Sequence, residues 1–271
     1  MKPFVKWVGG KTQLLPVIRK KLPASFGTYY EPFVGGGAVL LDIAPQHAVI
    51  NDINSQLINC YRQIATNYDK LVVTLYTLQV RFNNLPTDER RSEFFYNARK
   101  FYNDRMFVDL NEHNAALFIF LNKTCFNGLY RTNRKGLFNT PFGKKKRINL
   151  CDDSGLKSTS ELLSRLQILN TDFGNVCDTA KPGDFVFFDS PYYDTFDAYQ
   201  KGGFSTEDHT RLFRLFSRLS DNGIKCMLTN SNTDFIKDLY KDYNIECVGT
   251  RRAINSDATN RVGEDLIITN Y

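Results

Sequence analysis

The sequence lacks the patterns that mark metal-binding, secreted and membrane proteins. Its six cysteines include no CxxC pair, and its three histidines form no HExxH motif. We therefore expect no metal site and a reduced, cytoplasmic protein without disulfides. The apolar run at residues 115–121 is far shorter than the roughly 20 residues needed to span a bilayer, and the N-terminus has no apolar signal core.

The sequence also shows no internal repeat, low-complexity tract or Pro-rich linker. Of its 271 residues, 42% are hydrophobic and 24% are charged, as in globular proteins. This length favours one large α/β domain or a domain with a sizeable insertion.

The order of apolar patterns predicts a sheet that is interrupted by a helical stretch. Strand patterns lie at residues 28–31, 48–50, 166–169, 185–188, 224–228, 245–248 and 266–268. Helical spacing appears at residues 38–43, 55–121, 206–219 and 233–240. We predict a doubly wound α/β sheet with an inserted, mostly helical and basic domain: residues 1–54 and 161–271 form the sheet domain, and residues 55–160 form the insertion with a basic hairpin.

The motif Asp189-Ser190-Pro191-Tyr192 follows the apolar run at residues 185–188. That run reads as a buried parallel strand, and open α/β sheets bind their ligands at the C-terminal ends of such strands. A carboxylate, a backbone carbonyl fixed by Pro191 and a flat ring suit a planar amino group, such as the exocyclic amine of a nucleobase. An ordinary turn after the strand is the alternative.

Residues 123–149 contain eight basic and no acidic residues, more than the whole net charge of +6. Phe, Tyr, Asn and Gly residues alternate with these charges, which suits contact with both phosphates and bases. This pattern predicts nucleic-acid binding, although a solvated loop would have a similar composition.

Residues 31–37 form a Gly-rich turn, and Asp52 follows the next strand. Glycines allow close approach of a ligand, and an acid at the second strand suits ribose hydroxyls, so the pair indicates a nucleoside-bearing ligand. Residues 9–12 resemble the end of a phosphate-binding loop, but Val5 replaces its first glycine. Trp7 and Lys11 fit better as an aromatic wall and a cation beside a carboxylate-bearing cofactor, or simply as a core and a surface residue.

In their order, these segments resemble the Dam-type DNA adenine-N6 methyltransferases, which use S-adenosylmethionine. The resemblance covers nearly the whole chain and rests on the segments at residues 4–11, 31–37, 51–54, 126–131, 138–143, 189–192, 228–231 and 251–252. It implies a Rossmann-like methyltransferase sheet with an inserted DNA-recognition domain. The chain departs from the family at Ser190, where a proline is usual; the carbonyl remains, but the backbone is less rigid.

The resemblance also implies roles for individual residues. Asp189 and the Ser190 carbonyl would accept the two N6 hydrogens of an adenine flipped out of duplex DNA, and Tyr192 would stack on that base. The residues implied in cofactor binding are Trp7, Lys11, Glu31, Phe33, Gly35, Gly37, Asp52, Asp172, Phe173 and Asp189. For Asp172 and Phe173, which would hold the cofactor's adenine, a plain turn is an equal interpretation.

By the same resemblance, Arg131 would read a guanine, and the site would be GATC. The other residues implied in DNA contact are Phe126, Asn127, Leu129, Arg134, Pro141, Lys144, Lys145, Lys146, Arg147, Arg251 and Arg252. We expect a monomer that acts on double-stranded DNA, with a cognate restriction endonuclease as a potential partner. The alternatives are cytosine-N4 methylation, a DNA-binding relative with impaired catalysis and, less favoured, an RNA or protein-glutamine methylase.

Overall fold

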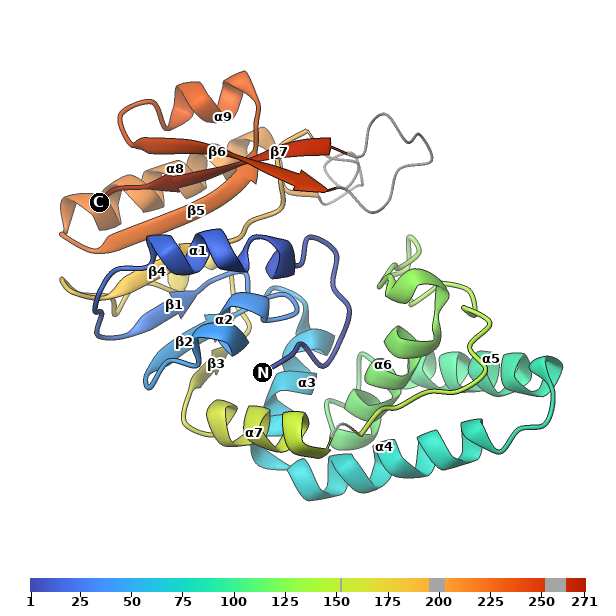
Figure 1. The fold of residues 1–271 in the computed structure, drawn as a ribbon. Helices are drawn as coiled ribbons and strands as arrows, with labels where there is room; N and C mark the ends of the chain where they lie inside the picture. Colours follow the sequence, from blue (N-terminus) through green and yellow to red (C-terminus); the bar gives the residue numbers. More distant parts are fainter. Residues whose placement is uncertain (152, 195–202, 252–261) are drawn as a thin grey trace. The chain divides into compact units, whose positions relative to one another are not determined.

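The computed structural model describes residues 1–151, 153–194, 203–251 and 262–271 (Figure 1). They form two compact units that are interleaved along the chain. We call the first the helical unit, which comprises Met1–Gly10, Gly35–Ala44 and Asp52–Asn170. The second, the sheet unit, comprises Lys11–Val34, Pro45–Asn51 and Thr171–Tyr271. The division at residues 54 and 160 stays a prediction.

Over the described residues, the structure has one sheet of seven strands in the order β3-β2-β1-β4-β5-β7-β6. The strands are β1 (Tyr29–Glu31), β2 (Ala48–Asn51), β3 (Gln167–Leu169), β4 (Phe185–Phe188), β5 (Lys225–Ser231), β6 (Asn244–Arg251) and β7 (Val262–Thr269). Strand β1 pairs in parallel with β2 and β4, and β4 pairs in parallel with β5. Strand β7 runs antiparallel to β5 and β6. The predicted α/β class and the parallel setting of residues 185–188 are confirmed.

The sheet unit also contains helices α1 (Leu15–Lys21), α8 (Thr206–Asp221) and α9 (Asp234–Leu239). In Figure 1, α1 lies in front of the sheet and α8 lies behind it, where it packs on β5. Helix α8 buries Leu212, Leu215, Phe216 and Leu219, a spacing of three and four residues that places one face on the sheet. Ser205 begins the helix through a capping box with Asp208.

The helical unit contains α2 (Ala38–Ile43), α3 (Ser55–Thr66), α4 (Tyr68–Asn83), α5 (Asp88–Arg105), α6 (Glu112–Thr124) and α7 (Asp153–Leu163). Helix α6 packs against α3, α4 and α5. Its residues from Asn114 to Asn122 are all buried, which is the pattern of a helix surrounded by others. The side chains of Asn54, Thr87 and Asn111 cap the N-termini of α3, α5 and α6.

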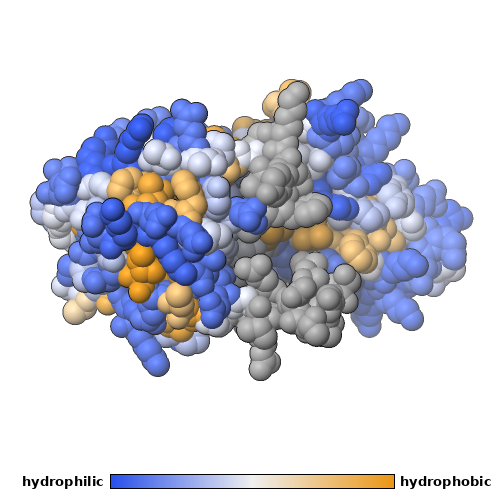
Figure 2. Space-filling view, turned by 90° about the horizontal axis from the view of Figure 1, so that it is seen from above, coloured by the Kyte–Doolittle hydropathy of each residue, from blue (hydrophilic) through white to orange (hydrophobic). Residues whose placement is uncertain are grey.

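The visible surface in Figure 2 is mostly hydrophilic, and hydrophobic residues gather there in a few groups. Part of the surface of any folded protein is apolar. Among the described residues, no helix combines the length and the apolar character that a membrane span requires.

Candidate active site

Asp189 follows β4 directly, and its carboxylate is bound from two directions within the sheet unit. It forms an ion pair with Lys11, whose side chain is 6% exposed, and Oδ1 accepts a hydrogen bond of 2.9 Å from the Thr229 hydroxyl on β5. Because β4 and β5 are parallel and in register to Phe188 and Leu228, Asp189, which directly follows β4, lies beside Thr229 within β5. Burial raises the pKa of the Asp189 carboxyl, and Lys11 and Thr229 partly offset this rise. The predicted strand-end carboxylate is thus held as a fixed acceptor.

Tyr192 lies against the same group of side chains. Its hydroxyl donates to Asp265 Oδ2 over 3.1 Å, and Lys11 Nζ is 4.6 Å from the ring centroid. Burial and the charge of Asp189 raise the pKa of the Tyr192 hydroxyl, so it remains a neutral donor. The side chain is only half-buried. A half-buried ring with an anchored hydroxyl offers a fixed face on which a base can stack.

The backbone after Tyr192 is held by the end of β5. Tyr193 N donates to Asn230 Oδ1 over 2.9 Å, and the Ser231 hydroxyl donates to Tyr193 O over 2.6 Å. These contacts fix the course of the chain just beyond the aromatic ring. The sequence indicated no individual role for Asn230 or Ser231, because the strand pattern stops at Leu228, although both lie in the segment at residues 228–231 that carries the family resemblance.

Ser190 is 2% exposed, and its hydroxyl has no hydrogen-bond partner among the described residues. The Asn230 Nδ2 donor is likewise buried without a described partner. Buried polar atoms without partners are rare in proteins, and such atoms are often satisfied by a bound ligand, ion or water. Pro191 is exposed.

The sheet unit holds the first part of the Gly-rich turn. Glu31 is buried and accepts a hydrogen bond of 2.8 Å from the Tyr29 hydroxyl. Phe33 is half-buried, and its ring lies 5.2 Å from that of Phe173 and 5.7 Å from that of Phe204. Glu31 is therefore part of the support of β1, whereas Phe33 belongs to an aromatic cluster that a planar ligand can contact.

In the helical unit, Asp52 anchors the second part of the turn. Its Oδ2 accepts a hydrogen bond of 3.0 Å from Gly35 N, and its Oδ1 accepts one of 2.8 Å from Asn54 N. Burial raises the pKa of the Asp52 carboxyl, and the two backbone donors partly offset this. Each oxygen retains a second lone pair, so a ribose hydroxyl can still bind there.

Gly35 and Gly37 have φ angles of 48° and 71°, a region that L side chains seldom adopt. A Cβ on Gly35 would lie 2.8 Å from Trp7 Cδ1, and one on Gly37 would lie 2.5 Å from the Tyr61 hydroxyl. The same hydroxyl donates to Gly35 O over 2.9 Å. The turn therefore requires both glycines for conformation and for space.

Trp7 is half-buried and stacks on Tyr130 at 5.6 Å and on Phe118 at 6.3 Å between ring centroids. The neighbouring residue Lys6 exchanges two backbone hydrogen bonds with the Asn122 side chain, at 2.8 and 2.9 Å. Trp7 is thus held in the helical unit by aromatic packing, and one of its partners, Tyr130, belongs to the basic segment at residues 123–149.

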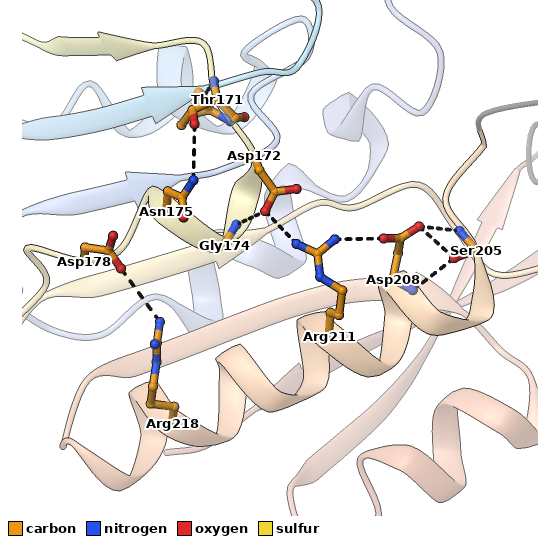
Figure 3. A network of polar contacts seen from close by, with 10 residues as sticks. Thr171, Asp172, Gly174, Asn175, Asp178, Ser205, Asp208, Arg211 and Arg218 are labelled. Atoms are coloured by element: carbon orange, nitrogen blue, oxygen red, sulfur yellow. Dashed lines mark hydrogen bonds and ion pairs between the residues drawn. The ribbon is translucent and has the colours of Figure 1, made fainter.

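Asp172 and Phe173 follow β3, at the start of a short 3₁₀ helix. Figure 3 shows the Asp172 carboxylate between the backbone of Gly174 and the Arg211 guanidinium on α8. Asp172 is 44% exposed, whereas Phe173 is 7% exposed. The sequence did not indicate a role for Arg211, which is separated from Asp172 by 39 residues.

The basic segment presents its predicted contact residues to solvent. The ones whose side chains are exposed are Phe126, Asn127, Arg131, Arg134, Pro141, Lys144, Lys145, Lys146 and Arg147, and Leu129 is half-buried. Its backbone forms the isolated bridges Thr132–Phe138 and Cys125–Phe142. Further backbone hydrogen bonds join its two halves, from Phe126 N to Pro141 O, from Gly143 N to Thr124 O and from Asn139 N to Arg131 O, at 2.8 to 3.0 Å. Asn127 has a φ of 55° beside Gly128, whose Cβ would lie 2.5 Å from Lys6 Cδ.

Two further predictions concern the end of β6. Arg251 is the last residue of that strand, and Arg252 lies outside the described residues. Within the part of the chain that the structure describes, no group of three or more His, Cys, Asp or Glu side chains is arranged to hold a metal ion.

Comparison with known proteins gives consistent matches. A family model for the D12 class N6 adenine-specific DNA methyltransferases matches residues 7–254. The chain is 40% identical to the type II methyltransferase M.MjaIII of Methanocaldococcus jannaschii, a match that covers 100% of this chain and 99% of that protein. It is 38% identical to the type II methyltransferase M1.LlaDCHI of Lactococcus lactis subsp. cremoris, over 100% and 96% of the two chains. It is also 32% identical to the DNA adenine methylase of Serratia marcescens, over 99% and 97%.

Proposed function

Because this chain belongs to the D12 class of N6 adenine-specific DNA methyltransferases, we propose that it methylates the adenine of GATC in duplex DNA, with S-adenosylmethionine as the methyl donor, after flipping that adenine out of the helix. The observation that carries this proposal is the buried Asp189 carboxylate at the end of β4, bound by Lys11 and Thr229 and followed by the half-buried Tyr192. Seven strands with a final antiparallel pair agree with the sheet of S-adenosylmethionine-dependent methyltransferases.

The chemistry required of the protein is to make a poor nucleophile react. The lone pair of adenine N6 is delocalised into the ring, so N6 attacks only when it becomes pyramidal. Asp189 and the Ser190 carbonyl accept the two N6 hydrogens and favour that geometry. Because the Asp189 carboxylate is held by Lys11 and Thr229, it needs no reorganisation as positive charge develops on N6. Asp189 then holds the proton that N6 releases when the new bond forms.

Tyr192 keeps the base in place during this step. Its hydroxyl donates to Asp265, which holds the half-buried ring in one orientation for stacking. Removing a base from the duplex costs a few kcal/mol, and contact with this ring recovers part of that cost.

The cofactor residues proposed are Lys11, Glu31, Phe33, Asp172, Phe173 and Asp189 in the sheet unit, and Trp7, Gly35, Gly37 and Asp52 in the helical unit. They fit the donor: the glycines leave no Cβ in the turn, Asp52 keeps lone pairs for ribose hydroxyls, and Asp172 keeps one oxygen without a described partner. When bound, S-adenosylmethionine supplies an electrophilic methyl group on a sulfonium. Every other part of the reaction falls to the residues of the chain.

We assign sequence reading to residues 55–160, which carry the basic segment. GATC is proposed because Asn127-Gly128-Leu129-x-Arg131 resembles the segment of family members that commonly read that site. The exposed Arg131 suits two hydrogen bonds to a guanine, while Lys144, Lys145, Lys146 and Arg147 suit phosphates. We further propose a cytoplasmic monomer; relatives named type II methyltransferases make a cognate restriction endonuclease a candidate partner.

The test is methyl transfer from radiolabelled S-adenosylmethionine to three duplexes, followed by nucleoside analysis. One duplex contains GATC, one contains the same bases scrambled, and the third contains GATC already methylated on both strands. We expect label in N6-methyladenine with the first duplex alone. Label in adenine of the scrambled duplex would overturn the site, and label in cytosine would overturn the target base. Cofactor binding without any label would indicate that Ser190 marks lost chemistry.

A further inference from the structure

Arg211 on α8 is held in one orientation by the start of its own helix. Its Nη1 donates to Asp208 Oδ1 over 3.0 Å, and Asp208 Oδ2 in turn accepts hydrogen bonds from the backbone and hydroxyl of Ser205, at 3.0 and 2.8 Å. The guanidinium is therefore attached to the capping box that begins α8 (Figure 3).

The other end of the guanidinium binds the carboxylate of Asp172. Nη2 donates to Asp172 Oδ1 over 2.8 Å, and the same oxygen accepts Gly174 N over 2.9 Å. Asp172 Oδ2 accepts no hydrogen bond from a described residue, and in Figure 3 it carries no dashed line. Two donors thus fix one oxygen and leave the second available to a ligand that donates an N–H or O–H.

Phe173, which is 7% exposed, belongs to an aromatic cluster beside this carboxylate. The Arg211 guanidinium lies 4.8 Å from the Phe173 ring centroid. The Phe173 ring also packs against the rings of Phe33 and Phe204, with distances of 5.2 and 5.6 Å between the ring centroids. A carboxylate oxygen at the edge of an aromatic cluster suits a planar heterocycle with an exocyclic amino group.

An ordinary surface ion pair does not account for this arrangement. Exposed ion pairs contribute only about 0–1 kcal/mol to stability. A simple ion pair along α8 would join Arg211 to Asp208 alone, three residues before it. Arg218 on the same helix provides the contrast, since it approaches Asp178 only to 3.9 Å and both side chains are more than half exposed. Arg211 instead joins two carboxylates and an aromatic ring in a fork geometry that arginine favours.

We propose that Arg211 is a positioning residue that orients the Asp172 carboxylate so that Oδ2 accepts the exocyclic amino group of the cofactor's adenine. This inference rests on the proposed use of S-adenosylmethionine. Through Asp172, Arg211 then makes the protein distinguish an amino group from an oxygen at that position of the cofactor's base. Arg211 itself contacts neither the methyl group nor the DNA.

The test measures the binding of two product analogues by calorimetry. S-Adenosylhomocysteine carries the amino group, whereas S-inosylhomocysteine carries an oxygen in its place. A hydrogen bond to a charged acceptor favours the first by roughly tenfold or more in the wild-type protein. Arg211→Ala should weaken the binding of S-adenosylhomocysteine by a similar factor and leave the binding of S-inosylhomocysteine nearly unchanged. The preference for the amino group is then abolished. The substitution should raise the KM for S-adenosylmethionine and change kcat by less than about twofold, since the reacting atoms are untouched.

Three variants separate positioning from general support. Arg218→Ala, the matched change on α8, should retain the full preference. Arg211→Lys should restore only part of it, because an ammonium cannot bind two carboxylates as a planar fork. In an Asp172→Ala background, Arg211→Ala should cause no further loss of preference.

The outcomes distinguish this inference from the proposed function. Equal weakening of both analogues by Arg211→Ala, or retention of the wild-type preference, overturns the role of Arg211 while cofactor use stands. A wild-type protein that binds neither analogue overturns S-adenosylmethionine as the donor and this inference with it. Melting temperatures of all variants are measured beside the affinities, and a preference lost at an unchanged melting temperature supports positioning.

Discussion

Asp189 and Arg131 are both charged residues for which the sequence predicted a function, yet their surroundings differ. Asp189 is bound by Lys11 and Thr229, and its side chain is 17% exposed. Arg131 is exposed, and its side chain makes no hydrogen bond or ion pair with a residue that the structure describes. In the proposed function, the Asp189 carboxylate is therefore organised before its ligand binds, whereas Arg131 would find its partner only on the DNA. Substitutions near Asp189 should therefore change the rate of methyl transfer and the response to pH. Substitutions in the basic segment should change the sequence preference and the salt dependence of DNA binding.

The largest effect is expected from Asp189→Ala. Loss of a fixed acceptor at the reacting nitrogen should lower methyl transfer by at least about a thousandfold. The fold should remain, because most of β4 is buried apolar surface. Transfer rates are measured beside circular dichroism, with Asp178→Ala, an exposed position, as control. An Asp189→Ala protein that methylates within tenfold of the wild type would remove Asp189 from the mechanism.

His209 tests the pH response of the buried region. It is 1% exposed, its ring lies 4.7 Å from Phe204 and 5.5 Å from Tyr193, and burial lowers its pKa from 6.5 to about 4. The unfolded chain takes up a proton near pH 6.5, whereas the folded protein does so only near pH 4. The free energy of unfolding should therefore fall as the pH drops through this window, by up to about 3 kcal/mol.

Urea unfolding between pH 7 and pH 4 measures this dependence. His209→Gln should flatten the curve relative to the wild type, whatever its effect at pH 7. His113→Gln, a change at an exposed side chain, should leave the slope as it is. Identical slopes for wild type and His209→Gln would mean that burial of this imidazole does not control acid stability.

Arg131→Ala should change sequence preference more than overall affinity. A two-bond contact to guanine is worth about 1–3 kcal/mol of discrimination, so the variant should lose roughly ten- to a hundredfold in preference at one base of the site. Transfer to duplexes that differ from GATC at single positions maps that base. Unchanged discrimination at every position would place sequence reading elsewhere in the chain.

The double change Lys145→Ala, Lys146→Ala should weaken DNA binding equally for all DNA sequences. Each phosphate contact adds about 0.9 to the slope of log affinity against log salt, so the slope should fall by about 1.8 if both side chains contact phosphate. If the two proteins have equal affinity at 1 M salt, this slope means a loss of roughly sixtyfold near 0.1 M salt, for GATC and scrambled duplexes alike. Lys157→Ala, on the exposed side of α7, serves as control. A loss restricted to GATC duplexes would assign base reading to these lysines.

The difference between the two regions also explains what could be predicted from the sequence. The apolar run at residues 185–188 between Gly183 and Pro191 indicated β4 and hence the position of Asp189. The sequence pattern ended β5 at Leu228, but the strand continues to Ser231 because its polar side chains find partners: Thr229 binds Asp189, and Asn230 binds Tyr193. Such partners are distant in sequence, and a local pattern contains no signal for them.

Arg211 shows the same limit more strongly. Its link to Asp172 spans 39 residues and depends on where α8 packs. The hairpin predicted in the basic segment stays a prediction: no regular strand forms there, but two isolated bridges and several backbone hydrogen bonds join the two halves of the segment. Composition revealed the charge of that segment, whereas its backbone depends on single residues such as Gly136, whose φ is 76°.

The smallest effect is expected from Ser190→Pro, which tests whether the buried region tolerates the residue usual in the family. The Ser190 hydroxyl is buried without a described partner, and its backbone N–H donates to no described residue, so proline removes no hydrogen bond that the structure shows. Proline would fix φ beside the carbonyl that is proposed to accept an N6 hydrogen. Methyl transfer should therefore stay within about threefold of the wild type or rise. Proline reduces the conformational freedom of the unfolded chain and of the loop, and this changes the free energy by less than about 1 kcal/mol. Ser190→Ala, which removes the hydroxyl without restricting φ, separates the two contributions. A large loss with proline and none with alanine would show that the backbone at Ser190 has a conformation in this chain that proline cannot adopt. Lys11, Thr229 and β5 would then position the Asp189 carboxylate and the Ser190 carbonyl, and the rigidity of the motif would not.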